Sequence, residues 1–348
     1  MQRQKFVKES LIFSFIFFTS FSFILSQPLP EIERELKALS MAFLDTLSLS
    51  EKLKINKQFT SKLKSCLTRS ESFAYPFDSL ATVSSLYASD KSFRIFTWQL
   101  TERVNDPIPQ TLNYFFGLFQ RKWIDQAGEE ELVIIPLIEL SKIPVDIENR
   151  ILDQNNWLGG LYYPARFGPD IPLLNIKYLD PSTGKKVKTP AYVAMGWNGY
   201  DAISNFKFVE VITPDPEVKD RIIFGANIFF YDLVPKYRVV FRYSDNAPFS
   251  LNYGYAKWGP GKLFRKRMVI YDHLANPNSN RRPGTPFALG PDGSYDALNF
   301  FKRGGYFEWY RNIEIAENYN SKLTQKMLQE QQSRERKRLQ SVGLPIEK

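Results

Sequence analysis

The only histidine of the chain, His273, lies in the sequence Tyr-Asp-His-Leu. Its neighbour Asp272 could complete an acid–base pair, because a carboxylate can orient an imidazole that transfers protons. However, consecutive strand residues point to opposite faces of a sheet, so we do not expect Asp272 to orient His273. A Ser-His-Asp triad would need the same histidine, and the chain has no G-x-S-x-G nucleophile elbow. We therefore expect a structural histidine at a strand end.

Carboxylates are the second group of candidate residues. Asp292 and Asp296 lie in and after an Asp-Gly turn, and two aspartates with one glycine are too few for a calcium loop, so we predict turn chemistry. Glycoside cleavage needs only two carboxylates, and the composition leaves that class open. The candidates near expected strand ends are Asp201, Asp232, Asp245, Asp272, Asp296 and Glu308. The sequence does not indicate which of them meet.

Aromatic residues are abundant, with 29 Phe, 18 Tyr and 6 Trp. Most must fill a core, but flat side chains near turns can also stack on sugars or anchor a protein. The segment 196–201 combines a turn signature with aromatic and hydrogen-bonding groups. The predicted binding residues are Trp197, Asn198, Tyr200, Asp201, Asp272 and His273.

Composition excludes several classes of site. One Cys excludes an internal disulfide and a multi-thiolate metal centre, and one His excludes histidine-cluster metal sites. We expect no cofactor, no metal, and a role for Cys66 as a small core residue rather than a nucleophile. The formal net charge of +9 comes mostly from the two ends of the chain, so we expect no nucleic-acid partner.

The first 26 residues have the pattern of an export signal. Basic residues precede an apolar run over 11–25, which is shorter than the roughly 20 residues that span a bilayer. We predict cleavage before Gln27 and a periplasmic or secreted protein, with a retained anchor as the alternative. No cysteine lies directly after the apolar run, since Cys66 is far downstream, so we do not expect a lipoprotein.

Two helices are expected over 31–68, followed by strands. The first helix carries an apolar stripe at helical spacing, and Ser48 with Glu51 forms a capping box for the second. From Phe73 onward, short aromatic and β-branched runs alternate with turn residues. The predicted strands are 92–100, 113–122, 131–140, 157–167, 173–179, 191–197, 206–212, 221–230, 237–243, 250–258, 266–274, 294–301 and 306–315.

So many strands with scarcely a helix between them exclude a βαβ sheet and predict a mainly β, antiparallel fold. The strands group over 157–212 and 221–274, as in blades of a propeller, and an irregular two-sheet sandwich is the alternative. The residues from Asn320 favour a C-terminal helix or a flexible tail. The predicted division is a signal peptide (1–26), a helical segment (27–72), a β domain (73–318) and a basic tail (319–348).

Several segments together resemble an uncharacterised family of exported proteins from Bacteroidota. They are SFAYPFDSL, SFRIFTWQL, GLFQ, LGGLYY, AMGWNGYDAISNFKFVEVI, FGANIF, YDHL and GPDGSYDALNF, and they extend over residues 73–300. The basic tail is not part of the family pattern. The resemblance implies bacterial export and brings no activity or catalytic residues.

The sequence thus favours an exported protein that binds an unknown protein or glycan of the cell envelope, or has a structural role there. The alternative is a carboxylate-dependent hydrolase acting on polysaccharide. A third possibility is weak contact with a membrane surface through the first helix or the basic tail, where residues 334–338 hold four basic side chains. A solvated charge run also accounts for that tail.

Overall fold

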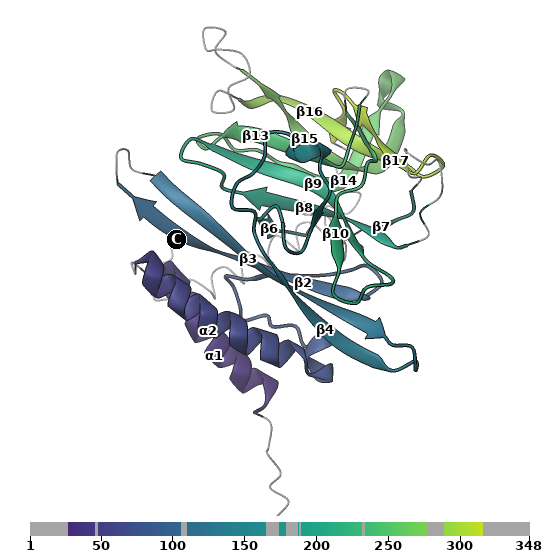
Figure 1. Cartoon of the computed structure of the whole chain (residues 1–348). Helices are drawn as coiled ribbons and strands as arrows, with labels where there is room; N and C mark the ends of the chain where they lie inside the picture. The colour runs from purple at the N-terminus through teal and green to yellow at the C-terminus, as the bar shows by residue number, and fades with distance from the viewer. Residues whose placement is uncertain are drawn as a thin grey trace, which may run out of the picture.

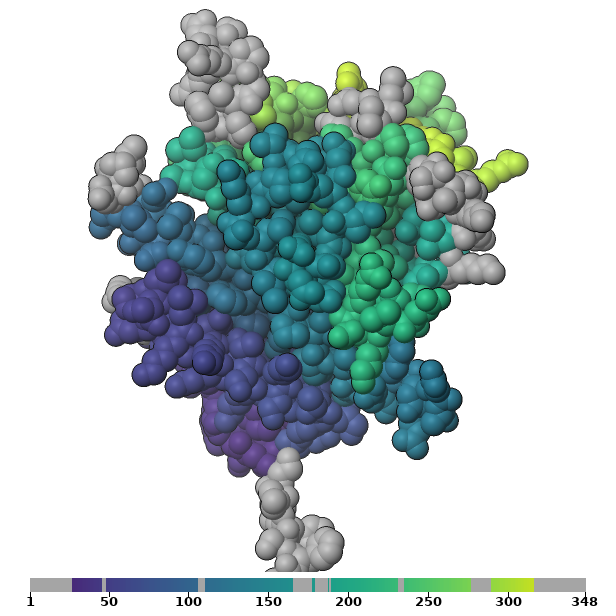
Figure 2. Space-filling view, viewed as in Figure 1, coloured from purple at the N-terminus to yellow at the C-terminus, as the bar shows by residue number. Residues whose placement is uncertain are grey.

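The computed structural model describes residues 27–45, 48–105, 110–164, 174–178, 187, 189–231, 234–276 and 289–315. These residues form four successive layers: a helical layer and three β-sheets (Figure 1). Chain order follows the layers, so that the colour in Figure 2 passes from purple at the helices to yellow at the far sheet. The predicted mainly antiparallel β fold with an N-terminal helical pair is confirmed.

The helical layer consists of α1 (Leu29–Met41), η1 (Ala42–Leu44), α2 (Leu49–Leu67) and η2 (Ser70–Phe73). The predicted capping box begins α2: Glu51 N donates to Ser48 Oγ at 3.4 Å, and Ser48 N donates to Glu51 Oε2 at 2.9 Å. Phe59, Leu63 and Leu67 recur every four residues and are fully buried. None of the described helices combines the length and apolarity needed to cross a bilayer.

The first sheet is an antiparallel meander of β1 (Ser84–Tyr87), β2 (Phe93–Val104), β3 (Gln110–Ile124) and β4 (Glu130–Leu137). Alternate residues of β2 serve two cores, as the period of a strand dictates. Phe96 and Trp98 pack against the helices, whereas Phe93 and Ile95 pack against the second sheet. The helices and the first two sheets are therefore held together by β2 and its neighbours.

The second sheet is the middle layer. Its strands are β5 (Leu152–Asp153), β6 (Leu161–Tyr162), β7 (Leu174–Ile176), β8 (Ala191–Asn198), β9 (Ser204–Pro214), β10 (Ile222–Phe224) and β13 (Arg238–Ser244), with η3 (Ile147–Asn149) beside it. The first six residues of β8 are all buried. Both faces are covered, because Tyr192 and Ala194 face the first sheet while Val193 and Met195 face the third.

The third sheet holds the remaining strands: β11 (Phe229–Tyr231), β12 (Val234–Lys236), β14 (Leu251–Trp258), β15 (Phe264–Ala275), β16 (Gly290–Phe301), β17 (Tyr306–Tyr310) and β18 (Glu314–Ile315), with η4 (Pro260–Lys262) between β14 and β15. Their order is β12-β11-β17-β16-β15-β14-β18, and only β11 and β17 pair in parallel among the described strand pairs. The ring centroids of Trp258 in β14 and Tyr310 in β17 are 4.8 Å apart, although β15 and β16 lie between these two strands. The sheet is therefore strongly curved around the two rings.

The structure corrects the expected architecture. Three stacked sheets replace both the two-sheet sandwich and the propeller blades. The predicted strand over 221–230 divides at Gly225, whose φ of 107° breaks the extended backbone, and the two pieces join different sheets. The group 221–274 is therefore not one blade. The predicted C-terminal helix and the signal peptide lie outside the described residues.

A buried ion pair lies between the first and second sheets. Arg238 of β13 donates from Nε to Glu210 Oε2 of β9 at 3.0 Å, and both side chains are fully buried. Tyr162 Oη donates to Glu210 Oε1 and accepts from Trp157 Nε1 at 3.0 Å. The other guanidinium nitrogens donate to the carbonyls of Ile147, Arg150 and Phe224. Every charge in this network has polar partners, which is the condition for burying an ion pair.

Candidate functional site

His273 lies near the end of β15 and faces a carboxylate that the sequence did not single out as its partner. Its Nδ1 is 3.0 Å from Asp296 Oδ2 of β16, and its side chain is 39% exposed. In the tautomer that carries its proton on Nδ1, the imidazole donates to Asp296 and keeps a lone pair on Nε2. Nδ1 of His273 is thus hydrogen-bonded to Asp296, whereas Nε2 lies on the other side of the ring.

Asp296 is buried and carries two further hydrogen bonds. Trp309 Nε1 donates to Oδ2 at 3.2 Å, and Asn312 N donates to Oδ1 at 2.9 Å. The carboxylate therefore fixes an imidazole, an indole and a backbone amide from β15, β17 and the segment after β17. Groups locked in this way have the pre-organisation that binding and catalytic sites need.

Asp272 does not orient His273, as the strand geometry predicts. Its Oδ2 accepts from Ser250 N at 2.5 Å, and burial raises the pKa of this carboxyl. The register between β15 and β16 shifts between Asp272 and Leu274, because a β-bulge on β16 places three residues, 292–294, opposite His273. Such bulges commonly re-aim a side chain next to functional sites.

Asp292 approaches the other side of the ring. Its Oδ2 lies 4.0 Å from His273 Nε2, while its Oδ1 accepts from Ser294 N and Ser294 Oγ. These bonds from Ser294 lower the pKa of Asp292. The turn predicted at Asp292-Gly293 is not present: both residues lie within β16, and the φ of 90° at the glycine marks a bulge of this strand that brings a second carboxylate near the imidazole. The cluster of His273, Asp292 and buried Asp296 is hereafter the histidine site.

The predicted binding loop after β8 uses most of its polar groups internally. Asn198 is buried and donates to Gly159 O at 3.2 Å, and Asp201 Oδ1 accepts from Ser204 N at 2.7 Å. Trp197 is half-buried with its ring centroid 6.2 Å from that of Phe115. Tyr200 is half-buried beneath the guanidinium of Arg242, at 4.5 Å. The structure does not bring this loop together with Asp272 and His273 in any described contact.

Glu139, just beyond the end of β4, was not among the sequence-based candidates. Its Oε2 accepts a hydrogen bond from Phe115 N at 2.8 Å. Because the pairing of β4 with β3 ends at Leu137, this carboxylate replaces the backbone acceptor that a longer β4 would offer to Phe115. Burial raises the pKa of Glu139 to about 7, and the bond from Phe115 N only partly opposes this. A carboxyl that exchanges its proton near neutral pH is suited to general acid–base chemistry.

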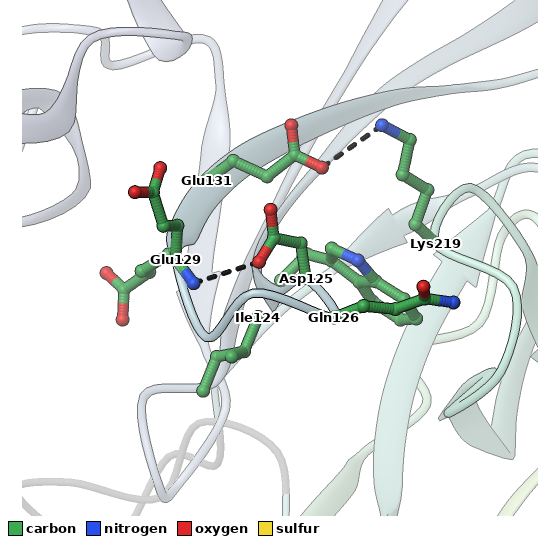
Figure 3. A pocket seen from close by; sticks show the side chains of 8 residues that line it. Ile124, Asp125, Gln126, Glu129, Glu131 and Lys219 are labelled. Atoms are coloured by element: carbon green, nitrogen blue, oxygen red, sulfur yellow. Dashed lines mark hydrogen bonds and ion pairs between the residues drawn. The ribbon is translucent and has the colours of Figure 1, made fainter.

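A shallow depression of about 580 Å³ lies at the β3–β4 turn. Figure 3 shows Asp125 accepting from Glu129 N, Glu131 paired with Lys219, and Ile124 pointing away from them. Trp123 lines the same depression, with Arg121 at 4.8 Å over its ring. These acidic groups are exposed, and their bonds are made within the β3–β4 turn and to Lys219.

The sequence indicated only some of the residues that form these sites. Asp296 was a candidate carboxylate, but its partnership with His273 depends on strand register and a bulge that residue types do not indicate. Glu139 could have been noticed as an ionisable residue at the end of the apolar run 132–138. Of the other candidate carboxylates, Asp245 accepts from Asn205 Nδ2, Glu308 accepts from Tyr310 Oη, and Asp232 lies outside the described residues.

Within the described part of the chain, no three His, Cys, Asp or Glu side chains are grouped so as to hold a metal ion. Cys66 is buried, and burial raises the pKa of its thiol. Comparison with protein-family models, with curated proteins and with solved structures found no match. The function is therefore argued from the geometry of the sites alone.

Proposed function

We propose that this chain is an exported protein of the cell envelope that acts by binding, and that its ligand contacts the histidine site. The observation that carries the proposal is the buried Asp296, which holds a solvent-exposed His273 at 3.0 Å. A purely structural histidine does not need a buried carboxylate with three donors behind a partly exposed ring. Pre-organised groups bind with a smaller loss of side-chain entropy.

The chemistry of the site favours a ligand with hydroxyl or amide groups. The Nε2 of His273 can accept a hydrogen bond, and the exposed Oδ2 of Asp292 can accept another from the same group or its neighbour. Envelope glycans and peptides both carry such donors. An unknown glycan or protein of the envelope is accordingly the proposed partner, and nucleic acid is not.

The single histidine makes a direct test possible. In a sample labelled with ¹³C-histidine, the ring of His273 gives the only histidine signals of the folded chain. Oligosaccharides and peptides released from a bacterial envelope are added one fraction at a time. We expect one fraction to shift these signals, and His273→Gln and Asp292→Asn to weaken its binding at least tenfold. Asp245→Asn removes an exposed carboxylate elsewhere and should leave binding unchanged.

Equal binding by the wild type and His273→Gln would place the contact elsewhere and overturn the assignment of the site. Export is tested separately by the N-terminal sequence of the protein recovered from the envelope fraction of cells. A start at Gln27 supports cleavage of the leader, whereas recovery of the whole chain from the cytoplasm contradicts export.

A carboxylate-dependent hydrolase is the second candidate function, and Glu139 favours it. A general acid acting near neutral pH needs a raised pKa, and that of Glu139 is about 7. The test is the release of reducing ends from envelope and plant polysaccharides. Release that Glu139→Gln abolishes supports a hydrolase, and release unchanged by that substitution assigns the activity to a contaminant.

A further inference from the structure

The hairpin between β14 and β15 has an exposed apolar tip. Leu263 is 81% exposed and Phe264 is 52% exposed, directly after the turn at 259–262. Exposed pairs of large apolar residues at the end of a projecting hairpin are costly in water, because their hydration is unfavourable. This tip is hereafter the apolar tip.

The apolar tip has a defined conformation. Phe264 stacks on Trp258 with ring centroids 4.8 Å apart, and it lies so close to Gly259 that a Cβ there would be 2.6 Å from its ring. Gly259, Gly261 and Lys262 all have positive φ values, which sets the turn that presents Leu263. Lys262 also donates from Nζ to Asn312 O. The exposed residues are therefore presented on a structured turn.

Basic residues gather behind the apolar tip. The guanidinium groups of Arg265 and Arg267 both lie over the ring of Tyr255, at 4.6 and 4.9 Å from its centroid. The neighbouring β16–β17 turn lies at the same end of the antiparallel sheet and adds exposed Phe301, Lys302 and Arg303. Lys302 is close enough to Lys266 to lower its pKa, together with burial.

Few acidic residues offset this charge. Glu314 pairs with Lys257 at 2.8 Å, and Glu308 lies near Lys266 and accepts from Tyr310 Oη. The basic residues at this end of the sheet are Lys262, Arg265, Lys266, Arg267, Lys302 and Arg303. The two turns together therefore carry a local excess of positive charge around exposed apolar side chains.

We propose that these two turns dock the protein onto an anionic membrane surface, with Leu263 and Phe264 inserted into the bilayer interface. Apolar side chains of interfacial segments enter about 5 to 10 Å into the boundary between headgroups and acyl chains. Arg267 follows Phe264 by three residues, which is about 10 Å along an extended strand. With Phe264 inserted among the acyl chains, Arg267 lies at the level of the lipid phosphate groups. The apolar tip thus meets the acyl chains, and the basic residues behind it meet the anionic headgroups.

This order distinguishes a bilayer from an acidic protein or a polyanion. A polyanion has no apolar layer for Leu263 and Phe264, and a protein partner usually offers a broad face rather than a layer for two projecting turns. Docking also leaves the histidine site accessible. His273 is nine residues beyond Phe264, about 30 Å along an extended strand, so it lies at the opposite end of β15 from the apolar tip.

The test uses the chain from Gln27, which contains every described element, and flotation with vesicles of phosphatidylcholine alone or with 30% phosphatidylglycerol. We expect binding only to the anionic vesicles, and Leu263→Ser/Phe264→Ser to weaken it at least tenfold. Basic residues near an anionic surface contribute similar amounts to binding, so Arg265→Gln/Arg267→Gln should weaken binding by about 30-fold and reduce its salt dependence. Ile124→Ser, at an exposed turn of the first sheet, is the control and should bind normally.

A second measurement follows insertion directly. Cys66 is buried, so a Leu263→Cys variant can be labelled selectively with a polarity-sensitive dye. We expect blue-shifted, brighter emission with anionic vesicles and no change with neutral ones. Three results would overturn the proposal: unaltered dye emission, binding that persists in the Leu263→Ser/Phe264→Ser variant, or binding that is lost only when residues 319–348 are removed. Binding of heparin in preference to vesicles would also overturn it, in favour of a polyanion.

Discussion

Two glutamates at the boundary between the first and second sheets have contrasting surroundings. Glu210 is fully buried, yet it accepts from Arg238 at 3.0 Å and from Tyr162. Glu139 lies at the rim with only the bond from Phe115 N, and its pKa rises to about 7. The more deeply buried carboxylate is the better partnered one.

The contrast shows that the donors around a buried carboxylate matter more than its depth. A cation and a hydroxyl replace the water that Glu210 loses, whereas one amide cannot do so for Glu139. Glu210 therefore belongs to the framework, while Glu139 is able to change its charge in the physiological range of pH. Three substitutions test this comparison.

The largest effect is expected at Arg238. Arg238→Met leaves Glu210 buried without a cation and removes three donors to backbone carbonyls, so the free energy of unfolding should fall by about 3 to 5 kcal/mol. Denaturation with urea measures the loss. Lys236→Met is the matched control, because it breaks a half-exposed pair with Glu148 at 2.8 Å and should cost less than about 1 kcal/mol.

A double variant separates charge from packing. In Arg238→Met/Glu210→Gln no unpaired charge remains, so part of the lost stability should return. If the double variant is no more stable than Arg238→Met, the loss comes from packing around the guanidinium, and the electrostatic interpretation of the comparison is incorrect.

The second effect concerns Glu139 and depends on pH. Its folded pKa of about 7 exceeds the ordinary value of 4.5, so between these values the folded state binds more protons than the unfolded state. Stability from this group is therefore full below pH 4.5 and is lost as the pH rises through 7. The loss is about 3 to 4 kcal/mol, since the two pKa values differ by about 2.5 units and each unit corresponds to about 1.4 kcal/mol.

Glu139→Gln should remove this dependence. We expect the variant and the wild type to have similar unfolding free energies at pH 4.5, and the variant to be more stable at pH 8. The difference between the two curves isolates Glu139 from all other titrating groups. A constant difference across this range would show that Glu139 has an ordinary pKa in the folded chain.

Much of the local structure could be predicted from residue patterns. The helical pair, the capping box at Ser48 and most strands follow from spacing and turn residues, because these signals act over a few neighbouring positions. The stacking of sheets could not be predicted. The run 221–230 reads as one strand, and only the conformation at Gly225 and the burial of its two halves in different cores divide it.

The candidate sites show the same limit. His273 was identified by type, and the inability of Asp272 to orient it follows from strand alternation. Its true partner depends on the pairing of β15 with β16 and on a bulge, which are long-range properties. The charge of the β14–β15 hairpin is visible in the sequence, but the exposure of Leu263 and Phe264 beside it is a property of the fold.

The smallest of the three effects concerns Tyr162, which connects Glu210 to Trp157. Tyr162→Phe removes one of the two side-chain donors to Glu210 and the acceptor for Trp157 Nε1, and should cost about 1 to 2 kcal/mol because the ion pair with Arg238 remains. Denaturation with urea measures the loss. No measurable loss would mean that Arg238 alone holds the charge of Glu210, and that the comparison depends on the cation rather than on the number of donors.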